Sequence, residues 1–275
     1  MKNSHNIYLI SDSTGETLDR IFLALKAQFE SFEYKINQFS FTRTETQIKK
    51  IIENAEKNKK SIILYTIVNS KLAKFLADEC NKKKIPCFGV LGELILNFSK
   101  LLNQKASHEP SGQHVLNKEY YDRIEAIQFT MNHDDGNSIR DIEKSDILLL
   151  GVSRTSKTPT SIYLANRGYK VSNIPLVNEK SVPDKMKDIK FKPCVVGLTT
   201  EPERLYEIRR NRLTSLKEKE STEYINIKEI KKEIESSKKI FRMNKWPTID
   251  VTRKSVEETA ASIIKIYEIK SKKNA

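Results

Sequence analysis

The chain contains 275 residues, 38% of them hydrophobic and 31% charged, so it can bury one large core or two ordinary ones and is not expected to be disordered. Its longest apolar run, residues 147–152, is far shorter than the roughly 20 residues that cross a bilayer, which excludes a membrane-spanning protein. A strand-like run begins at Ile7 and leaves no room for a secretory signal, and the three cysteines have no common metal or redox spacing. We therefore expect a cytoplasmic protein.

The positive charge is concentrated in the second half of the chain. Residues 1–150 contain 21 Lys or Arg and 20 Asp or Glu, whereas residues 151–275 contain 28 and 16. Such a field attracts nucleic acids, phosphorylated small molecules and acidic protein surfaces alike. No helix-turn-helix, zinc-finger or single-strand-binding motif accompanies the charge, so we do not expect a nucleic-acid partner.

The first hundred residues alternate between strand and helix patterns. A strand at 7–10 leads through a polar loop to apolar residues at helical spacing, and the pattern continues with a helix at 47–57, a strand at 61–68, a helix at 70–82 and a strand at 85–90. Unbroken apolar strands separated by helices indicate a parallel sheet that is covered on both faces. We assign residues 1–104 to an N-terminal parallel-sheet α/β domain, because residues 103–117 lack a periodic apolar pattern.

The rest of the chain, residues 105–275, shows a second α/β pattern. We expect a helix at 120–126, an extended segment at 127–131, a polar turn at 133–136, a further helix, and a strand at 146–150. Beyond these we expect a helix from Pro159 capped by Gly168, a strand at 169–174, a helix in 217–239, a strand at 248–251 and a final helix from about Ser255. We assign this region to a P-loop-containing α/β kinase-like domain.

The strongest local motif follows the expected strand at 146–150 and has the frame of a phosphate-binding loop. In such a loop the backbone N–H groups converge on phosphate oxygens, Lys157 adds a positive charge, and the Thr158 hydroxyl is placed to bind Mg²⁺. The common pattern has Gly before the lysine, so here Ser156 must make a tight turn with a residue that carries a Cβ. The alternative is a Ser/Thr-rich turn that only caps a helix, but the flanking strand and helix favour phosphate binding. The loop residues are Gly151, Val152, Ser153, Arg154, Thr155, Ser156, Lys157 and Thr158.

Five separate motifs have the order and spacing of a known family. They are residues 10–17, residues 129–136, residues 150–161, residues 197–205 with Arg209 and Arg212, and residues 249–252 leading to 257–260. With these motifs the chain resembles the bacterial and plant regulatory proteins of pyruvate, phosphate dikinase and of phosphoenolpyruvate synthase. The resemblance covers nearly the whole chain, and a Ser before the loop lysine belongs to the pattern of that family.

The resemblance implies a bifunctional enzyme that acts on a protein. Such enzymes use ADP to phosphorylate a threonine of the dikinase or synthase, which inactivates it, and use inorganic phosphate to remove the group as pyrophosphate. A P-loop lysine normally contacts the last two phosphates of a nucleotide, so a loop that binds ADP would hold the β-phosphate, which is the group transferred. The resemblance does not decide whether the target protein is pyruvate, phosphate dikinase or phosphoenolpyruvate synthase. The alternative function is a P-loop kinase that acts on a small metabolite. A homodimer is compatible with the sequence.

An acidic turn is the candidate source of the general base. His133, Asp134 and Asp135 belong to one of the shared motifs, and a threonine hydroxyl that attacks phosphorus must lose its proton, usually to a carboxylate. We expect catalytic roles for Lys157 and for at least one of the two acids, with His133 beside them. The alternative is an ordinary Asp-Gly turn.

Two arginines are candidates for binding phosphate or the target protein. Arg209 and Arg212 are three residues apart in a segment with helical apolar spacing, so they share a face and could clamp phosphate oxygens. The alternative is a solvated basic helix face.

Overall fold

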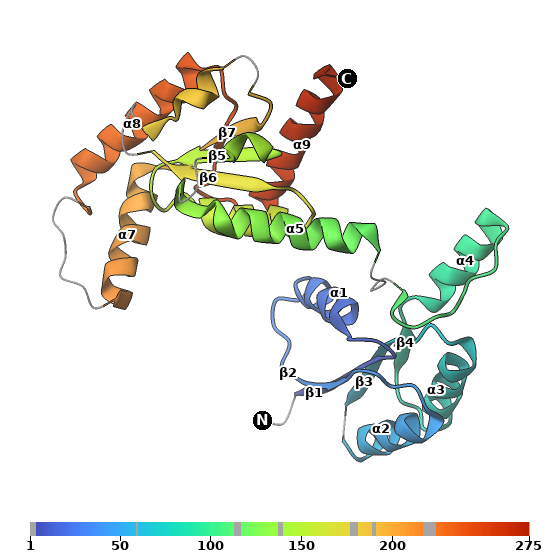
Figure 1. The fold of residues 1–275 in the computed structure, drawn as a ribbon. Helices are drawn as coiled ribbons and strands as arrows, with labels where there is room; N and C mark the ends of the chain where they lie inside the picture. The colour runs from blue at the N-terminus through green and yellow to red at the C-terminus, as the bar shows by residue number, and fades with distance from the viewer. Residues whose placement is uncertain are drawn as a thin grey trace. The chain divides into compact units, whose positions relative to one another are not determined.

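The computed structural model describes residues 4–58, 60–112, 117–136, 140–176, 181–188, 191–216 and 224–274. The chain forms two compact units, Met1–Val115 and Leu116–Ala275, and each contains its own four-stranded parallel sheet (Figure 1). The expected α/β class is confirmed. The units divide later than the position we expected after residue 104, because the loop beyond it stays with the N-terminal sheet: the His108 Nδ1 atom lies 2.7 Å from the Val68 carbonyl oxygen, and the Ser111 and Ser13 hydroxyls are 2.8 Å apart.

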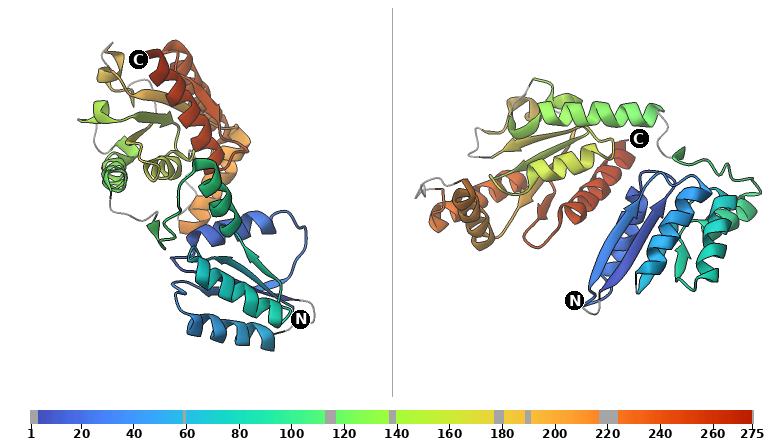
Figure 2. Two further views of the ribbon diagram at one scale, coloured as in Figure 1. Left: turned by 90° about the vertical axis from the view of Figure 1, so that its right-hand side faces the viewer. Right: turned by 90° about the horizontal axis from the view of Figure 1, so that it is seen from below.

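The N-terminal sheet has the strand order β2-β1-β3-β4, and all its pairings are parallel. In the described part of the unit, the first helix packs on one face and the second and third helices pack on the other (Figure 2). The elements are β1 (His5–Ser11), α1 (Glu16–Lys26), β2 (Tyr34–Phe39), α2 (Glu45–Lys57), β3 (Ser61–Thr66), α3 (Ser70–Lys82), β4 (Cys87–Gly89) and α4 (Gly92–Leu102).

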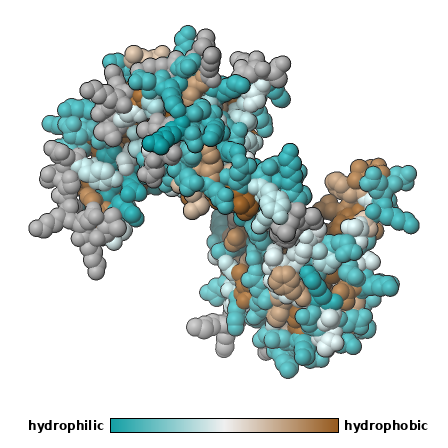
Figure 3. Space-filling model, in the orientation of Figure 1, coloured by the Kyte–Doolittle hydropathy of each residue, from teal (hydrophilic) through white to brown (hydrophobic). Residues whose placement is uncertain are grey.

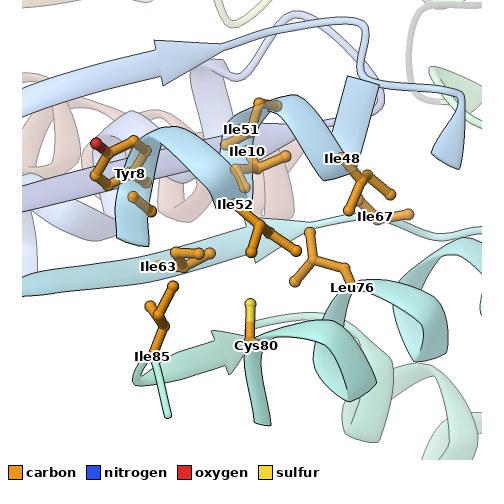
Figure 4. Close-up of a cluster of buried hydrophobic side chains, with 11 residues drawn as sticks. Tyr8, Ile10, Ile48, Ile51, Ile52, Ile63, Ile67, Leu76, Cys80 and Ile85 are labelled. Carbon is orange, nitrogen blue, oxygen red and sulfur yellow. The ribbon is translucent and has the colours of Figure 1, made fainter. Parts of the chain in front are cut away.

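Helical spacing explains how α2 joins the core of this unit. Its residues Ile48, Ile51 and Ile52 recur at intervals of three and four, so they share one face and pack against Tyr8 and other side chains of the sheet (Figure 4). The Thr44 side chain accepts a hydrogen bond from the Gln47 N–H, and Gln47 reaches back to the N–H of Thr44. This capping box starts the helix at Glu45, two residues before the position that the apolar pattern indicates.

The C-terminal sheet has the same arrangement, with the strand order β6-β5-β7-β8 and parallel pairings throughout. The helices α6 and α9 pack on one face, and α8 packs on the other. The elements are α5 (Lys118–Asn132), η2 (Asp134–Gly136), η3 (Ile142–Lys144), β5 (Ile147–Gly151), α6 (Lys157–Ala165), β6 (Val171–Pro175), η5 (Asp184–Lys187), β7 (Cys194–Thr199), α7 (Pro202–Leu216), α8 (Ile227–Met243), β8 (Thr248–Asp250) and α9 (Val256–Asn274).

Two local expectations for this unit are wrong. Residues 127–131, expected to be extended, continue α5, because Ala126 and Thr130 are four apart and both buried, and the Thr130 hydroxyl accepts a hydrogen bond from the Val171 N–H of the sheet edge. The helix expected before the strand at 146–150 is, in its described part, only the short turn η3. Of the segment 217–239, residues 217–223 lie outside the described residues, and α8 begins at Ile227.

The strands expected at 146–150, 169–174 and 248–251 are confirmed as β5, β6 and β8. All five residues of β5 are buried, as an unbroken apolar run between two neighbouring strands requires. In the part of the chain that the structure describes, no helix is both long enough and apolar enough to cross a membrane.

Candidate active site

The loop that the sequence predicts to bind phosphate, residues 151–158, lies at the carboxyl end of β5. This strand pairs with β6 on one side and β7 on the other, so it is the point where the chain changes direction across the sheet. Parallel α/β sheets bind ligands in the crevice at such a point. The loop opens on a hollow of about 270 Å³, which is lined by Asp135, Ser153, Arg154, Ser156, Lys157, Thr158, Pro159 and Ile208.

The backbone of the loop is bent by residues that carry side chains. Arg154 and Ser156 have φ angles of 72° and 59°, both in the left-handed region, and Ser156 immediately precedes α6. The Thr155 hydroxyl donates to the Val152 carbonyl at 2.9 Å and braces the turn. The expectation that Ser156 makes the turn in place of Gly is therefore confirmed. Turns of this kind direct successive N–H groups toward one concave surface, which suits an anion.

Gly151 must remain without a side chain for this loop to form. A Cβ atom there would lie 2.6 Å from the Thr155 Oγ1 atom and 2.7 Å from the Leu198 carbonyl oxygen, which belongs to the backbone of the neighbouring strand. We expect Gly151→Ala to lower the free energy of unfolding by roughly 1–3 kcal/mol, as overpacking does, and to weaken phosphate binding. Urea unfolding and calorimetry with ADP measure both effects. Gly112→Ala is the matched control, because nothing lies within 4 Å of its Cβ position; equal losses in both variants would contradict the close contact.

Lys157 points into the loop rather than into solvent. Its side chain is buried, and its Nζ donates to the Val152 carbonyl at 3.1 Å. Burial lowers the pKa of Lys157 from 10.5 to about 8, against the opposing charges of Asp135 and Asp134, while Arg154 and Arg209 lower it further. A phosphate group bound next to Lys157 would therefore stabilise the charged form of this side chain, which burial disfavours.

The low pKa of Lys157 predicts how phosphate binding depends on pH. The Lys157 side chain carries its positive charge below pH 8 and loses this charge as the pH rises through that value. The phosphate groups of ADP are already ionised there, since the second pKa of a phosphate ester is about 6. We expect the Kd for ADP, measured by calorimetry without Mg²⁺, to rise by up to about tenfold per pH unit above pH 8. A Kd that stays constant up to pH 9.5 would show that Lys157 does not hold the phosphates.

The lowered pKa of Lys157 has the opposite effect on the stability of the unliganded protein, which rises with pH. Between pH 8 and 10.5 the unfolded chain retains the Lys157 proton that the folded chain has released. The destabilisation caused by the buried ammonium is therefore fully present below pH 8 and is relieved as the pH rises through this window.

The two adjacent acids have different surroundings. The Asp134 carboxylate accepts hydrogen bonds through Oδ1 from the Thr158 hydroxyl, at 2.9 Å, and from the side-chain amide of Asn173. Asp135 has a φ of 48° and lines the hollow beside Lys157. Its backbone N–H donates to the Asn173 Oδ1 atom at 3.0 Å. The expected turn is confirmed, but it follows the helix α5 and not a strand.

Asn173 is a site residue that the sequence motifs do not include. It is fully buried on β6. Its side-chain NH₂ group donates to the Asp134 carboxylate and, at 3.4 Å, to the Ser161 hydroxyl, and its side-chain oxygen accepts from the Asp135 N–H. Its own N–H donates to the His133 carbonyl at 3.1 Å. An amide inside an apolar strand is the signal that could have identified it, because buried polar groups require partners.

His133 lies against α5 and does not line the hollow. Its Nδ1 atom is 2.7 Å from the Phe129 carbonyl oxygen, which can only accept, so Nδ1 carries a proton. The ring stacks on Phe129 with the centroids 3.9 Å apart, and Nε2 is buried without a hydrogen-bond partner among the described residues. A catalytic role for His133 stays a prediction.

Arg209 forms an ion pair with Glu233 of the neighbouring helix α8. Its guanidinium binds Glu233 through two hydrogen bonds of 2.6 and 3.3 Å, donates to the Tyr224 carbonyl and lies over the Tyr224 ring. The side chain is buried, whereas Arg212 is exposed on α7. The phosphate clamp that we expected from these two residues stays a prediction, and in this geometry only Arg212 is solvated.

The described residues contain no group of three or more His, Cys, Asp or Glu side chains that could hold a metal ion by themselves. The oxygens of Thr158 and Asp134 are nevertheless adjacent at the edge of the loop. Magnesium is commonly bound by one or two protein oxygens and otherwise by phosphates and water, so this pair fits the ion.

The N-terminal unit also has a polar loop after its first strand. Asp12 is buried there and accepts a hydrogen bond from the Val68 N–H at 2.7 Å. Gly15, with a φ of 90°, is the residue before α1, and no side chain caps that helix. The chain therefore enters α1 through a left-handed glycine.

Comparison with known proteins gives a consistent result. The family model described as kinase/pyrophosphorylase matches residues 7–264. A protein of Pelagibacter ubique (strain HTCC1062) that bears the name pyruvate, phosphate dikinase regulatory protein is 69% identical over 269 residues, 98% of each chain. Proteins of the same name are 45% identical in Erythrobacter litoralis (strain HTCC2594), over 97% of this chain and 95% of the relative, and 44% identical in Wolbachia sp. subsp. Brugia malayi (strain TRS), over 95% and 97%.

Proposed function

The chain belongs to the kinase/pyrophosphorylase family, and from that premise we propose that it is a bifunctional regulator of pyruvate, phosphate dikinase. In one direction it transfers a phosphoryl group from ADP to a threonine of the dikinase and so inactivates it. In the other it uses inorganic phosphate to remove that group as pyrophosphate and restores the activity. The relatives with 69% and 45% identity, whose names specify this target, support it.

One observation carries the chemistry: Lys157 and Asp135 face the same hollow at the phosphate loop. ADP bound with its terminal phosphate in the loop places the β-phosphorus between the lysine and the acid. The threonine oxygen attacks that phosphorus, its proton passes to Asp135, and the bond to the bridging oxygen breaks, so AMP leaves. Lys157 stabilises the negative charge on the phosphoryl oxygens during the transfer.

The reverse reaction uses the same groups in opposite roles. An oxygen of inorganic phosphate attacks the phosphorus of the phosphothreonine, and the bond from phosphorus to the threonine oxygen breaks. Asp135 returns a proton to that oxygen, and pyrophosphate is released. Because Lys157 contacts the moving phosphoryl group in both directions, one loop serves both activities.

We assign the proton transfer to Asp135 rather than to Asp134. The Asp134 carboxylate is already engaged by Thr158 and Asn173, whereas the Asp135 side chain is given no such partner among the described residues and lines the hollow. Asp134 and Thr158 would together hold Mg²⁺, which when bound offsets phosphate charge. Arg212, exposed on α7, would meet the acidic or phosphorylated surface of the target.

The test is an in vitro transfer assay with separate targets. The purified chain is incubated with ADP labelled at the β-phosphate and with pyruvate, phosphate dikinase or phosphoenolpyruvate synthase. We expect label on a threonine of the dikinase, and its release as labelled pyrophosphate after inorganic phosphate is added. Label only on the synthase would transfer the same chemistry to that target. Consumption of ATP with a small metabolite and no labelled protein would replace the proposal by a metabolite kinase.

A further inference from the structure

Asn173 is a polar residue in the middle of a strand whose neighbour is apolar. It is paired with Leu149 of β5, a strand in which all five residues are buried. The visible surface of the C-terminal unit is mainly hydrophilic (Figure 3), whereas the Asn173 side chain has no exposed surface. Burying an amide costs free energy unless its donor and its acceptor are both hydrogen-bonded. Asn173 therefore requires specific partners, and the acidic turn at residues 133–135 provides most of them.

The two polar atoms of the Asn173 amide act on different acids. Its Nδ2 atom donates to Oδ1 of Asp134, and its Oδ1 atom accepts from the Asp135 N–H at 3.0 Å. The main-chain N–H of Asn173 donates to the His133 carbonyl at 3.1 Å. A carboxylate could only accept and an ammonium could only donate, so the pair of side-chain contacts requires an amide.

The contact with Asp134 leaves one carboxylate oxygen available. Oδ1 of Asp134 accepts from the Thr158 hydroxyl, at 2.9 Å, as well as from Asn173. Among the described residues, no donor is bonded to its Oδ2 atom. Hydrogen bonds of this kind orient a carboxylate that binds a metal ion. Asn173 thus fixes the carboxylate that would hold Mg²⁺ together with Thr158.

The contact with Asp135 stabilises a backbone conformation that residues with a Cβ rarely adopt. Asp135 has a φ of 48°, in the left-handed region, where most side chains are strained. Its N–H is bonded to Asn173 in this conformation, and its side chain lines the hollow together with Lys157. The direction in which the Asp135 side chain leaves the main chain therefore depends on Asn173.

We propose that Asn173 is the positioning residue of the phosphoryl-transfer site, and that its single amide orients Asp134 for Mg²⁺ and Asp135 for proton transfer. This inference rests on the proposed function and adds that neither acid keeps its role without this residue of β6. The alternative is that Asn173 only attaches the turn to the sheet. Its loss would then lower the stability of the unit and would affect ADP binding equally with and without Mg²⁺.

The first test measures the binding of ADP by calorimetry, once with Mg²⁺ and once with EDTA. Asn173→Leu keeps the size of the side chain and removes its donor and its acceptor. We expect the Kd in EDTA to stay close to that of the wild type, and the tightening by Mg²⁺ to fall by about ten- to hundredfold, as is usual when an outer partner of a metal ligand is lost. A folded Asn173→Leu variant with the Mg²⁺ effect of the wild type, or a wild type without any Mg²⁺ effect, would overturn the proposal.

Ser172→Ala is the matched control for this test. Ser172 is the preceding residue of β6 and is also buried, but its hydroxyl lies 2.6 Å from that of Ser145, outside the site. We expect the Kd for ADP and the Mg²⁺ effect to stay unchanged in this variant. An equal loss of the Mg²⁺ effect in Ser172→Ala and Asn173→Leu would show that any change in β6 disturbs the site, and would refute a specific role for Asn173.

The second test asks whether Asn173 acts through the two acids. Asn173→Leu should lower the single-turnover rate of transfer about ten- to hundredfold in the wild type. In the Asp135→Asn background the same change should cost about threefold or less, since the proton acceptor is already absent. In the Asp134→Asn background it should no longer alter the Mg²⁺ effect on ADP binding. Effects that multiply fully in both backgrounds would show that Asn173 acts independently of the acids.

Two further measurements keep the result unambiguous. Urea unfolding shows whether Asn173→Leu is folded, and Asn173→Thr, which suits a strand but is too short to reach both acids, replaces it if it is not. The test with Mg²⁺ requires no target protein, so it still decides the role of Asn173 if the wild type transfers nothing to the dikinase and the proposed function fails. Transfer by Asn173→Leu at the rate of the wild type would refute the positioning role alone.

Discussion

Lys157→Met is expected to slow both the phosphorylation of the target and its phosphorolysis by at least about a hundredfold, which is the usual cost of losing one oriented charge at a transferring group. The Lys157 Nζ lies inside the loop, hydrogen-bonded to the Val152 carbonyl, and it is the only lysine among the described residues that line the hollow. Both directions should fall together, because the same phosphoryl group passes this position in each. Rates are measured with β-labelled ADP and with phosphorylated dikinase plus inorganic phosphate.

Folding of this variant is the necessary control. Burial lowers the pKa of Lys157, so the charged side chain costs stability at neutral pH and a methionine of similar length should not destabilise the protein. Lys170→Met removes a partly exposed lysine that pairs with Glu125 and should leave both rates unchanged. If Lys157→Met unfolds in urea like the wild type and keeps either rate near normal, the loop lysine has no part in that direction.

Asp135→Asn is expected to lower both rates by roughly a hundredfold to ten-thousandfold, the range for loss of a general acid or base. The amide is nearly the same size as the carboxylate but cannot take the threonine proton. The Kd for ADP should change little, since the base acts on the hydroxyl and the loop holds the nucleotide. Single-turnover assays separate the chemical step from binding.

Asp134→Asn is the matched variant one residue away. Its carboxylate accepts hydrogen bonds from Thr158 and Asn173, so the change disturbs the loop edge and should reduce the Mg²⁺-dependent part of the rate. A lost rate in Asp134→Asn with a normal rate in Asp135→Asn would reverse the two assignments. Normal rates in both would move the general base elsewhere, with Asp250 of β8 as the next acid in this unit.

The strand, turn and helix of the predicted phosphate loop could be located from the sequence because their signals are local. An unbroken apolar strand, a polar turn and a helix with Gly168 beyond its end succeed one another directly, and the structure has β5, the loop, α6 and a left-handed Gly168 in that order. The parallel sheet of the N-terminal unit was predictable for the same reason. Where local preference was misleading, as in residues 127–131, burial of Thr130 on the sheet edge selected the helix instead.

The amino-acid sequence by itself thus determined several of the strands and helices, among them β5, β6 and β8, and the position of the loop between β5 and α6, because periodicity and turn chemistry act over a few neighbours. Only the tertiary structure decided the separate roles of Asp134 and Asp135, since Asn173 reaches them from a strand far along the chain. It likewise decided that Arg209 forms its ion pair with Glu233 of α8. These outcomes depend on which distant surfaces meet and which polar groups burial forces to pair, and no local pattern encodes either.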